Sequence, residues 1–102
     1  MRTLIFILIL GFVRSAVAMV TYTDDVKVIL DKYCVECHDS IAHDPDFSRY
    51  PFPSESYLSQ FAIGDKLLYV VSAQVMPPGI RPKLKPNEVA VIQNWIEGGM
   101  VE

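Results

Sequence analysis

Apolar side chains recur with a helical period in three separate stretches of this chain. In the first, residues 24–37, they lie three or four positions apart: Val26, Ile29, Leu30, Tyr33, Cys34 and Cys37. This spacing places them on one face of a helix. Thr23 or Asp24 can cap its start, because their side-chain oxygens accept hydrogen bonds from free backbone N–H groups. The pattern predicts an amphipathic helix that carries both cysteines.

The second stretch predicts a helix from Asp65 to Ala73, with four apolar positions: Leu67, Leu68, Val70 and Val71. Gly64 supplies a break before it, and Asp65 can cap it. Residues 57–63 are expected to add at most a short helical turn.

The third stretch predicts a last helix from Pro86 to Glu97. Proline suits the first helical position, where its missing N–H costs nothing. Glu88 lies in the first turn, where the helix dipole favours a negative charge, whereas Lys85 before the helix is a poor cap. Trp95 is expected to pack in the core rather than to relay electrons.

Residues 39–56 show no periodicity. Pro45, Pro51 and Pro53 exclude a long helix or a central strand there. Irregular loops of this length in a small domain are usually functional or packed on something. No strand pair is indicated, so the sequence predicts an all-α domain of short helices and long loops.

The first 18 residues resemble an export signal. Arg2 precedes an apolar run over residues 4–13, and Ala16-Val17-Ala18 forms a small-residue cleavage site. The run is shorter than the roughly 20 residues that span a bilayer, and Arg14 follows it, which favours a cleaved signal peptide over an uncleaved anchor. We therefore predict cleavage after Ala18, one domain over residues 19–102, no stable membrane span after cleavage, and a periplasmic or otherwise exported location.

The charge of the predicted mature chain limits its partners. Without Arg2 and Arg14, seven basic and twelve acidic side chains remain, a net charge of −5. Nucleic-acid-binding proteins carry a basic face, so nucleic acid is not an expected partner. Three basic residues lie close together in the sequence: Arg81, Lys83 and Lys85. We interpret them first as part of a solvated loop and second as a docking patch for an acidic protein.

The segment Cys34-Val35-Glu36-Cys37-His38 has the pattern by which haem is attached covalently. Two thiols two residues apart can each add across one haem vinyl group, and the next histidine can supply a nitrogen to the iron. A Cys34–Cys37 disulfide with thiol redox activity is one alternative, but its usual βαβ context is absent. A zinc site formed by Cys34, Cys37, His38 and His43 is another alternative. Adjacent residues such as Cys37 and His38 are awkward ligands for one tetrahedral ion, and the chain has no second C-x-x-C. Chance is the third.

Residues 19–102 offer four candidates for the second axial ligand of a haem iron: Met19, Met76, Met100 and His43. Met19 would begin the mature chain, and Met100 is expected near a frayed terminus. His43 is too close to His38 in sequence to reach the opposite haem face easily. Met76 precedes Pro77 and Pro78, which restrict the local backbone. We predict ligation by His38 and Met76, with an ordinary core methionine as the alternative for Met76.

Three motifs together resemble the class I cytochrome c superfamily, in particular its small single-domain monohaem members. They are I-L-x-x-x-C-x-x-C-H at residues 29–38, M-P-P at 76–78 and W-I-x-x-G at 95–99, and they extend over essentially all of residues 19–102. The resemblance implies first and last helices that cross, one haem c attached through Cys34 and Cys37 after export, and electron transfer. Asp39, where the family often has glycine, is a departure.

The expected function is electron transfer between a donor and an acceptor protein, rather than enzyme catalysis. No general base, nucleophile or second metal site is evident beside the attachment motif. Two alternatives stay open: a haem subunit of a larger oxidoreductase, and a haem enzyme or gas-binding protein with an open sixth site. Co-purification would identify the first, and a high-spin spectrum the second.

Overall fold

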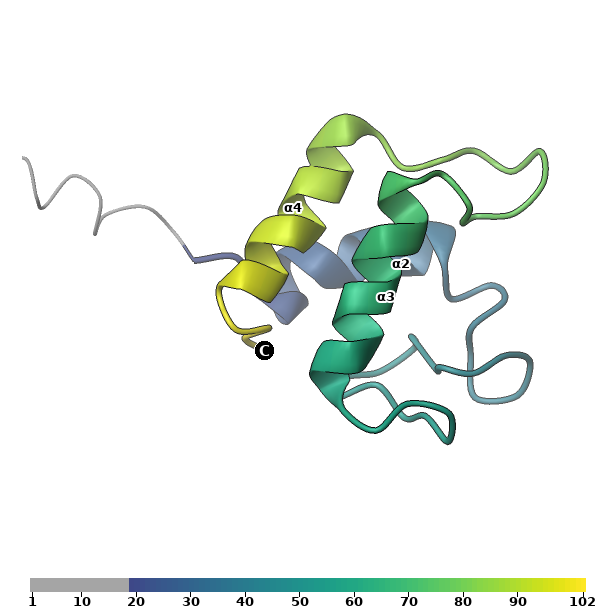
Figure 1. Cartoon of the computed structure of the whole chain (residues 1–102), viewed down its shortest axis with the longest axis horizontal. Helices are drawn as coiled ribbons and strands as arrows, with labels where there is room; N and C mark the ends of the chain where they lie inside the picture. Colours follow the sequence, from purple (N-terminus) through teal and green to yellow (C-terminus); the bar gives the residue numbers. More distant parts are fainter. Residues whose placement is uncertain (1–18) are drawn as a thin grey trace, which may run out of the picture.

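The computed structural model describes residues 19–102, so the predicted signal peptide lies outside the described part. Four helical segments follow in chain order: η1 (Tyr22–Val26), a single π-helical turn, then α2 (Lys27–Tyr33), α3 (Gln60–Ser72) and α4 (Pro86–Glu97). Within residues 19–102 there is no strand, which confirms the all-α class (Figure 1). Over the same range, no helix combines the length and the apolar character needed to cross a bilayer.

The first helical region begins and ends earlier than predicted. Thr21 caps it, because its hydroxyl accepts a hydrogen bond from the Asp24 N–H at 3.1 Å, and the predicted cap at Thr23 or Asp24 is wrong. Helix α2 ends at Tyr33: the Cys34 N–H makes the last i→i−4 bond, to the Leu30 carbonyl at 2.8 Å, and the Val35 N–H donates to the same carbonyl at 3.0 Å. The cysteines therefore follow the helix in a turn.

Helix α3 begins at Gln60, well before the predicted start at Asp65. The Ser59 hydroxyl caps it by accepting from the Ala62 N–H at 3.1 Å. Gly64, predicted as a break, is buried inside the helix, and a Cβ atom there would lie 2.9 Å from the Met100 sulfur. The glycine permits a close approach of the C-terminal segment, a tertiary requirement that the local sequence does not reveal.

Helix α4 has the predicted bounds, and its start is better capped than expected. The side chain of Lys85 makes no capping bond, but the Glu88 carboxylate accepts from the Lys85 backbone N–H at 2.8 Å. Glu88 also accepts from the Tyr33 hydroxyl at 2.7 Å. This second bond joins the start of α4 to the end of α2.

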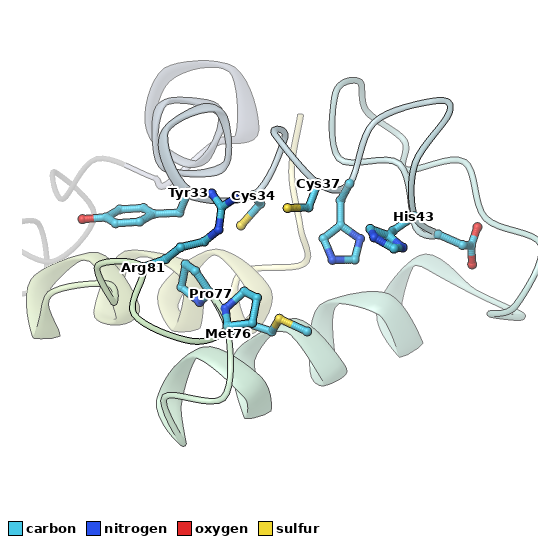
Figure 2. A pocket seen from close by; sticks show the side chains of 10 residues that line it. Tyr33, Cys34, Cys37, His43, Met76, Pro77 and Arg81 are labelled. Carbon is cyan, nitrogen blue, oxygen red and sulfur yellow. The ribbon is translucent and has the colours of Figure 1, made fainter.

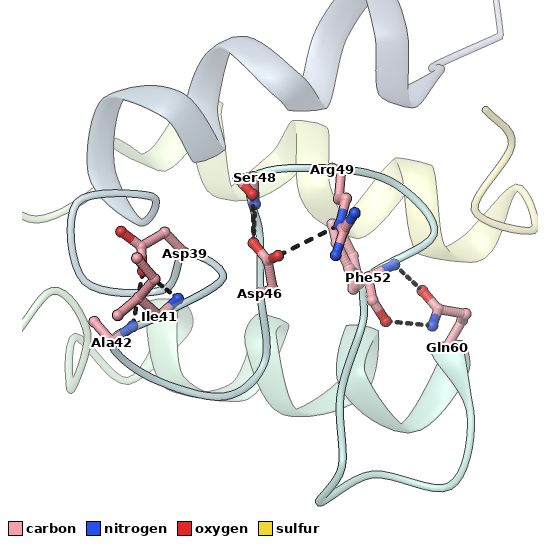
Figure 3. Close-up of polar contacts among 8 residues, drawn as sticks. All are labelled: Asp39, Ile41, Ala42, Asp46, Ser48, Arg49, Phe52 and Gln60. Carbon is pink, nitrogen blue, oxygen red and sulfur yellow. Dashed lines mark hydrogen bonds and ion pairs between the residues drawn. The ribbon is translucent and has the colours of Figure 1, made fainter.

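The long loop over residues 39–56 is packed on the rest of the domain, one of the two alternatives that its length suggested. Asp39 accepts from the backbone N–H groups of Ile41 and Ala42 at 2.9 and 2.8 Å, and Gln60 exchanges two 2.8 Å hydrogen bonds with the backbone of Phe52 (Figure 3). The Asp39 side chain thus closes a turn that a glycine at this position would leave unbonded. These contacts hold the loop against the start of α3.

An aromatic cluster, to which this loop contributes three rings, fills the core: Tyr22, Phe47, Tyr50, Phe52 and Trp95. Trp95 is 0% exposed, which confirms its predicted core position, and its indole N–H donates to the Val101 carbonyl at 2.9 Å. The Tyr22 and Tyr50 rings stack at 4.7 Å between centroids. Helix α4 packs against both η1 and α3 (Figure 1).

The C-terminal residues are tied to the start of the domain, so the prediction of a frayed terminus around Met100 is wrong. The N–H groups of Tyr22 and Thr23 donate to the carbonyls of Val101 and Glu102 at 2.8 and 3.0 Å. Met100 is 5% exposed, and its carbonyl accepts from the hydroxyl of Tyr50 at 2.6 Å. The pairing is non-local, which explains why residue type alone did not indicate it.

Candidate cofactor-binding site

The turn after α2 presents both thiols to one cavity. The N–H groups of Cys37 and His38 donate to the Cys34 carbonyl at 3.2 and 2.9 Å, which folds residues 34–38 back on themselves. Cys34 is 8% exposed and Cys37 is half-buried. Their sulfur atoms lie on the same wall of the cavity, and Met76 lies on the opposite wall (Figure 2).

Two adjoining cavities, of about 240 and 210 Å³, meet between these walls. Four residues line both of them: Cys34, His38, Asp44 and Met76. The remaining lining of the second cavity is largely apolar and comes from α3 and from the long loop, including Phe47, Ile63 and Leu67. We call the pair of cavities the slot. A flat ligand between His38 and Met76 would occupy both.

The imidazole of His38 is oriented by a backbone carbonyl. Its Nδ1 lies 3.2 Å from the carbonyl oxygen of Pro45. A carbonyl can only accept, so in the neutral ring this contact requires the proton on Nδ1 and leaves the lone pair on Nε2. The ring also packs edge-on against Phe47, with 5.3 Å between centroids. These contacts fix both the tautomer and the direction of the ring.

The segment that carries Met76 is fixed at two points. The Met76 N–H donates to the carbonyl of Val70 at 3.2 Å, at the end of α3. The Lys83 ammonium donates to the carbonyl of Pro77 and, at 3.4 Å, to that of Gly79. The half-buried thioether is therefore presented to the slot by a bonded loop.

The two walls of the slot are joined at one edge. Arg81, from the Met76 loop, forms an ion pair with Glu36, from the turn that carries the cysteines.

Asp44 is held separately, since its carboxylate accepts from the Ser54 hydroxyl at 2.7 Å and the Glu55 N–H at 3.0 Å. The hydrogen bond from the Ser54 hydroxyl lowers the pKa of Asp44, so the slot carries a negative charge at Asp44 at neutral pH.

Burial raises the pKa of the Cys34 thiol to about 12, and the neighbouring Cys37 adds to the effect. The thiolate is the reactive form of cysteine in thiol–disulfide exchange. Catalytic thiols have lowered pKa values, so this environment disfavours the thiol redox alternative.

The structure brings together, around one cavity, five of the candidate ligand residues considered from the sequence: Cys34, Cys37, His38, His43 and Met76. His43 also lines the 240 Å³ cavity, and its ring centroid lies 5.9 Å from that of His38. Met100 packs on Gly64, and Met19 is largely exposed. Over residues 19–102, no three His, Cys, Asp or Glu side chains are grouped to hold a metal ion.

Three site features were not anticipated from the sequence. They are the Pro45 carbonyl, the contacts of Lys83 with the Met76 loop, and the ion pair between Arg81 and Glu36. A backbone carbonyl has no residue signature, and the ion pair joins positions far apart in sequence. The cluster of basic residues after Met76 was the one available signal for Lys83 and Arg81.

Comparison with protein-family models, with curated proteins and with solved structures finds no match. The fold and the site define a small all-α domain with a thiol pair, a directed imidazole and a thioether around an apolar slot. This donor set is chemically suited to a covalently held haem, which needs two thiols for its vinyl groups and neutral N and S ligands for its iron.

Proposed function

We propose that this protein is an exported c-type cytochrome that carries one haem and transfers electrons. The observation that carries the proposal is the shared slot of Cys34, Cys37, His38 and Met76, with Nε2 of His38 left free by the bond to Pro45. Each cysteine would add its S–H across one vinyl C=C bond, forming a thioether without a leaving group. His38 and Met76 would bind the iron from opposite sides.

The roles of the chain's own residues follow from their contacts. The Pro45 carbonyl holds the His38 ring and raises the basicity of its free nitrogen. Met76 is a neutral, soft ligand that favours ferrous iron, and so keeps the reduction potential high. When bound, the haem supplies one-electron redox chemistry, and the apolar lining limits the access of water. The proposal includes a class I cytochrome c arrangement, in which the first and last helices cross beside the haem.

The fixed Met76 loop favours the electron carrier over the alternative with an open sixth site. A displaceable ligand would be expected on a loosely held segment, whereas this loop is bonded through Lys83 and tied by Arg81 to Glu36. Co-purification with a larger oxidoreductase would identify the subunit alternative.

The proposal is tested on protein produced with haem-attachment machinery. We expect haem to stay with the polypeptide through acid-acetone extraction and denaturing electrophoresis, and the ferric protein to show the near-red band of Met ligation. The mass should equal that of the chain cleaved after Ala18 plus one haem. Haem that washes out would refute covalent attachment, and retention of residues 1–18 would refute the predicted cleavage.

A further inference from the structure

A single charged side chain is buried in the part of the chain that the structure describes. Asp46, in the long loop, is 5% exposed, whereas every other Asp, Glu, Lys and Arg side chain among residues 19–102 is at least partly accessible. Burial of a carboxylate costs free energy unless hydrogen bonds or a counter-ion compensate its charge. We therefore expect Asp46 to have a role that an apolar residue at this position could not fill.

The residues on either side of Asp46 hold His38. The Pro45 carbonyl oxygen lies 3.2 Å from Nδ1 of the imidazole. The Phe47 N–H donates to the His38 carbonyl at 2.7 Å, and the Phe47 ring packs edge-on against the imidazole. Asp46 is thus the central residue of a three-residue segment that fixes both the backbone and the ring of the proposed iron ligand.

Asp46 in turn fixes this segment. Its N–H donates to the Pro53 carbonyl at 2.9 Å. Its Oδ1 atom accepts from the N–H and from the hydroxyl of Ser48, at 2.8 and 2.5 Å (Figure 3). These bonds close a turn around Phe47, so the position of the neighbouring Pro45 carbonyl depends on the Asp46 side chain.

The charge of Asp46 is only partly offset. Its Oδ2 atom is buried and makes no hydrogen bond within residues 19–102. Its ion-pair partner is Arg49, whose Nε lies 3.5 Å from Oδ2 and whose side chain is 68% exposed. These contacts are all with donors, so the arrangement suits a carboxylate, because a neutral carboxylic acid would need an acceptor for its proton. A partly offset negative charge therefore lies within the segment that holds His38.

We propose that Asp46 is a positioning residue that tunes the haem iron through His38. This inference rests on the proposed function. The bonds of Asp46 hold the Pro45 carbonyl against Nδ1, which orients the imidazole and raises the basicity of Nε2. Its buried negative charge stabilises the ferric state, which carries one more positive charge than the ferrous state, and so lowers the reduction potential. Asp46 would thus act against Met76, which raises the potential.

Removal of single charges tests the electrostatic part of the proposal. Asp46→Asn keeps an acceptor oxygen for Ser48, and should raise the equilibrium constant for one-electron reduction by about three- to tenfold, at most about 59 mV. Arg49→Gln should lower the midpoint potential, because the buried carboxylate loses its counter-ion. Both potentials are measured by spectroelectrochemical titration of the haem protein. A potential that is unchanged or lower in Asp46→Asn, or not lowered in Arg49→Gln, would overturn the proposal.

A matched variant shows whether the position of the carboxylate matters. Glu55 is exposed, and it lines the same polar cavity of about 320 Å³ as Asp46. Glu55→Gln changes the net charge as Asp46→Asn does, but solvent screens the charge that it removes. It should therefore shift the potential much less than Asp46→Asn. Shifts of equal size would show a dependence on net charge alone and contradict the role of Asp46.

The positioning part is tested by the iron–histidine stretching frequency in resonance Raman spectra of the ferrous Met76→Ala protein, where His38 would be the one protein ligand. Adding Asp46→Ala should lower this frequency, because the Pro45 carbonyl loses its support and the imidazole becomes less basic. Adding Ser48→Ala, which removes only the hydroxyl bond, should lower it by less, and adding Asp46→Asn should change it little. The Ser48→Ala result decides the matter if Asp46→Ala does not fold. An unchanged frequency there would overturn the positioning role.

The visible spectrum of each variant separates this inference from the proposed function. Wild-type protein without a covalent haem spectrum refutes the proposed function. An intact haem spectrum, together with a potential that Asp46→Asn does not raise, refutes only the role of Asp46.

Discussion

At the scale of single residues, Met76 distinguishes an electron carrier from a protein with an open haem site. Met76→Ala should leave haem attached, because the cysteines and His38 are unchanged. It should abolish the near-red band, allow cyanide and carbon monoxide to bind, and lower the reduction potential, since a soft neutral ligand is lost. Optical spectra and a redox titration of the purified variant measure all three effects.

Met100 provides the matched control for this substitution. It is 5% exposed and packs on Gly64 in α3, away from the slot. Met100→Ala should therefore keep the band and the potential while destabilising the fold by about 2–5 kcal/mol, as buried truncations do. A spectrum that survives Met76→Ala would assign the sixth position to another residue. A wild type that readily binds carbon monoxide would favour the open-site alternative.

At the scale of elements, the loop after α3 depends on Lys83, whose ammonium bridges the carbonyls of Pro77 and Gly79. Hydrogen bonds from a charged group contribute about 1.5–3 kcal/mol. Lys83→Met should keep the near-red band but speed cyanide binding to the ferric protein by about tenfold or more. Lys85→Met is the control, because it removes the same charge from the same loop without removing a hydrogen bond to Pro77 or Gly79. Equal rates in the two variants would show that Lys83 does not hold Met76 in place.

The junction of α2 with α4 depends on Glu88. Partial burial of this carboxyl opposes ionisation, but the Lys85 N–H, the Tyr33 hydroxyl and the charge of Lys32 outweigh it, so the pKa of Glu88 falls below its ordinary 4.5. A carboxyl whose pKa is lower in the folded state than in the unfolded state stabilises the fold at pH values above its unfolded-state pKa. This stability is lost as the pH falls through the folded-state pKa.

Substitution of Glu88 by glutamine tests this linkage. Glu88→Gln should lower the Tm of the haem protein by a few degrees at pH 7, where the wild-type carboxylate is ionised, and the difference should shrink at a pH well below 4.5 as the carboxylate becomes protonated. Thermal unfolding followed by circular dichroism at the two pH values measures this. A Tm difference of the same size at both pH values would mean that the charge of Glu88 does not stabilise the junction.

At the scale of the whole molecule, local signals predicted the elements well and non-local contacts were missed. Helix α4 was predicted with its observed bounds because proline, periodicity and glycine mark it within its own sequence. The start of α3 was wrong because Gly64 serves a contact with Met100 and not a break. Cys34, Cys37, His38 and Met76, which line one cavity, were chosen from sequence motifs. The carbonyl of Pro45 and the pairing of the two termini depend on tertiary structure, which no single segment specifies.

Folding of the whole domain should depend on the haem. The slot separates the turn that carries the cysteines from α3, and a domain this small buries a low fraction of its surface. Replacing both Cys34 and Cys37 with alanine should therefore give a poorly folded, haem-free product without a cooperative thermal transition in far-ultraviolet circular dichroism. Met76→Ala is the control, since it retains haem and should unfold cooperatively. A transition in the double variant similar to that of the wild type would show that the aromatic cluster around Trp95 is a sufficient core without the cofactor.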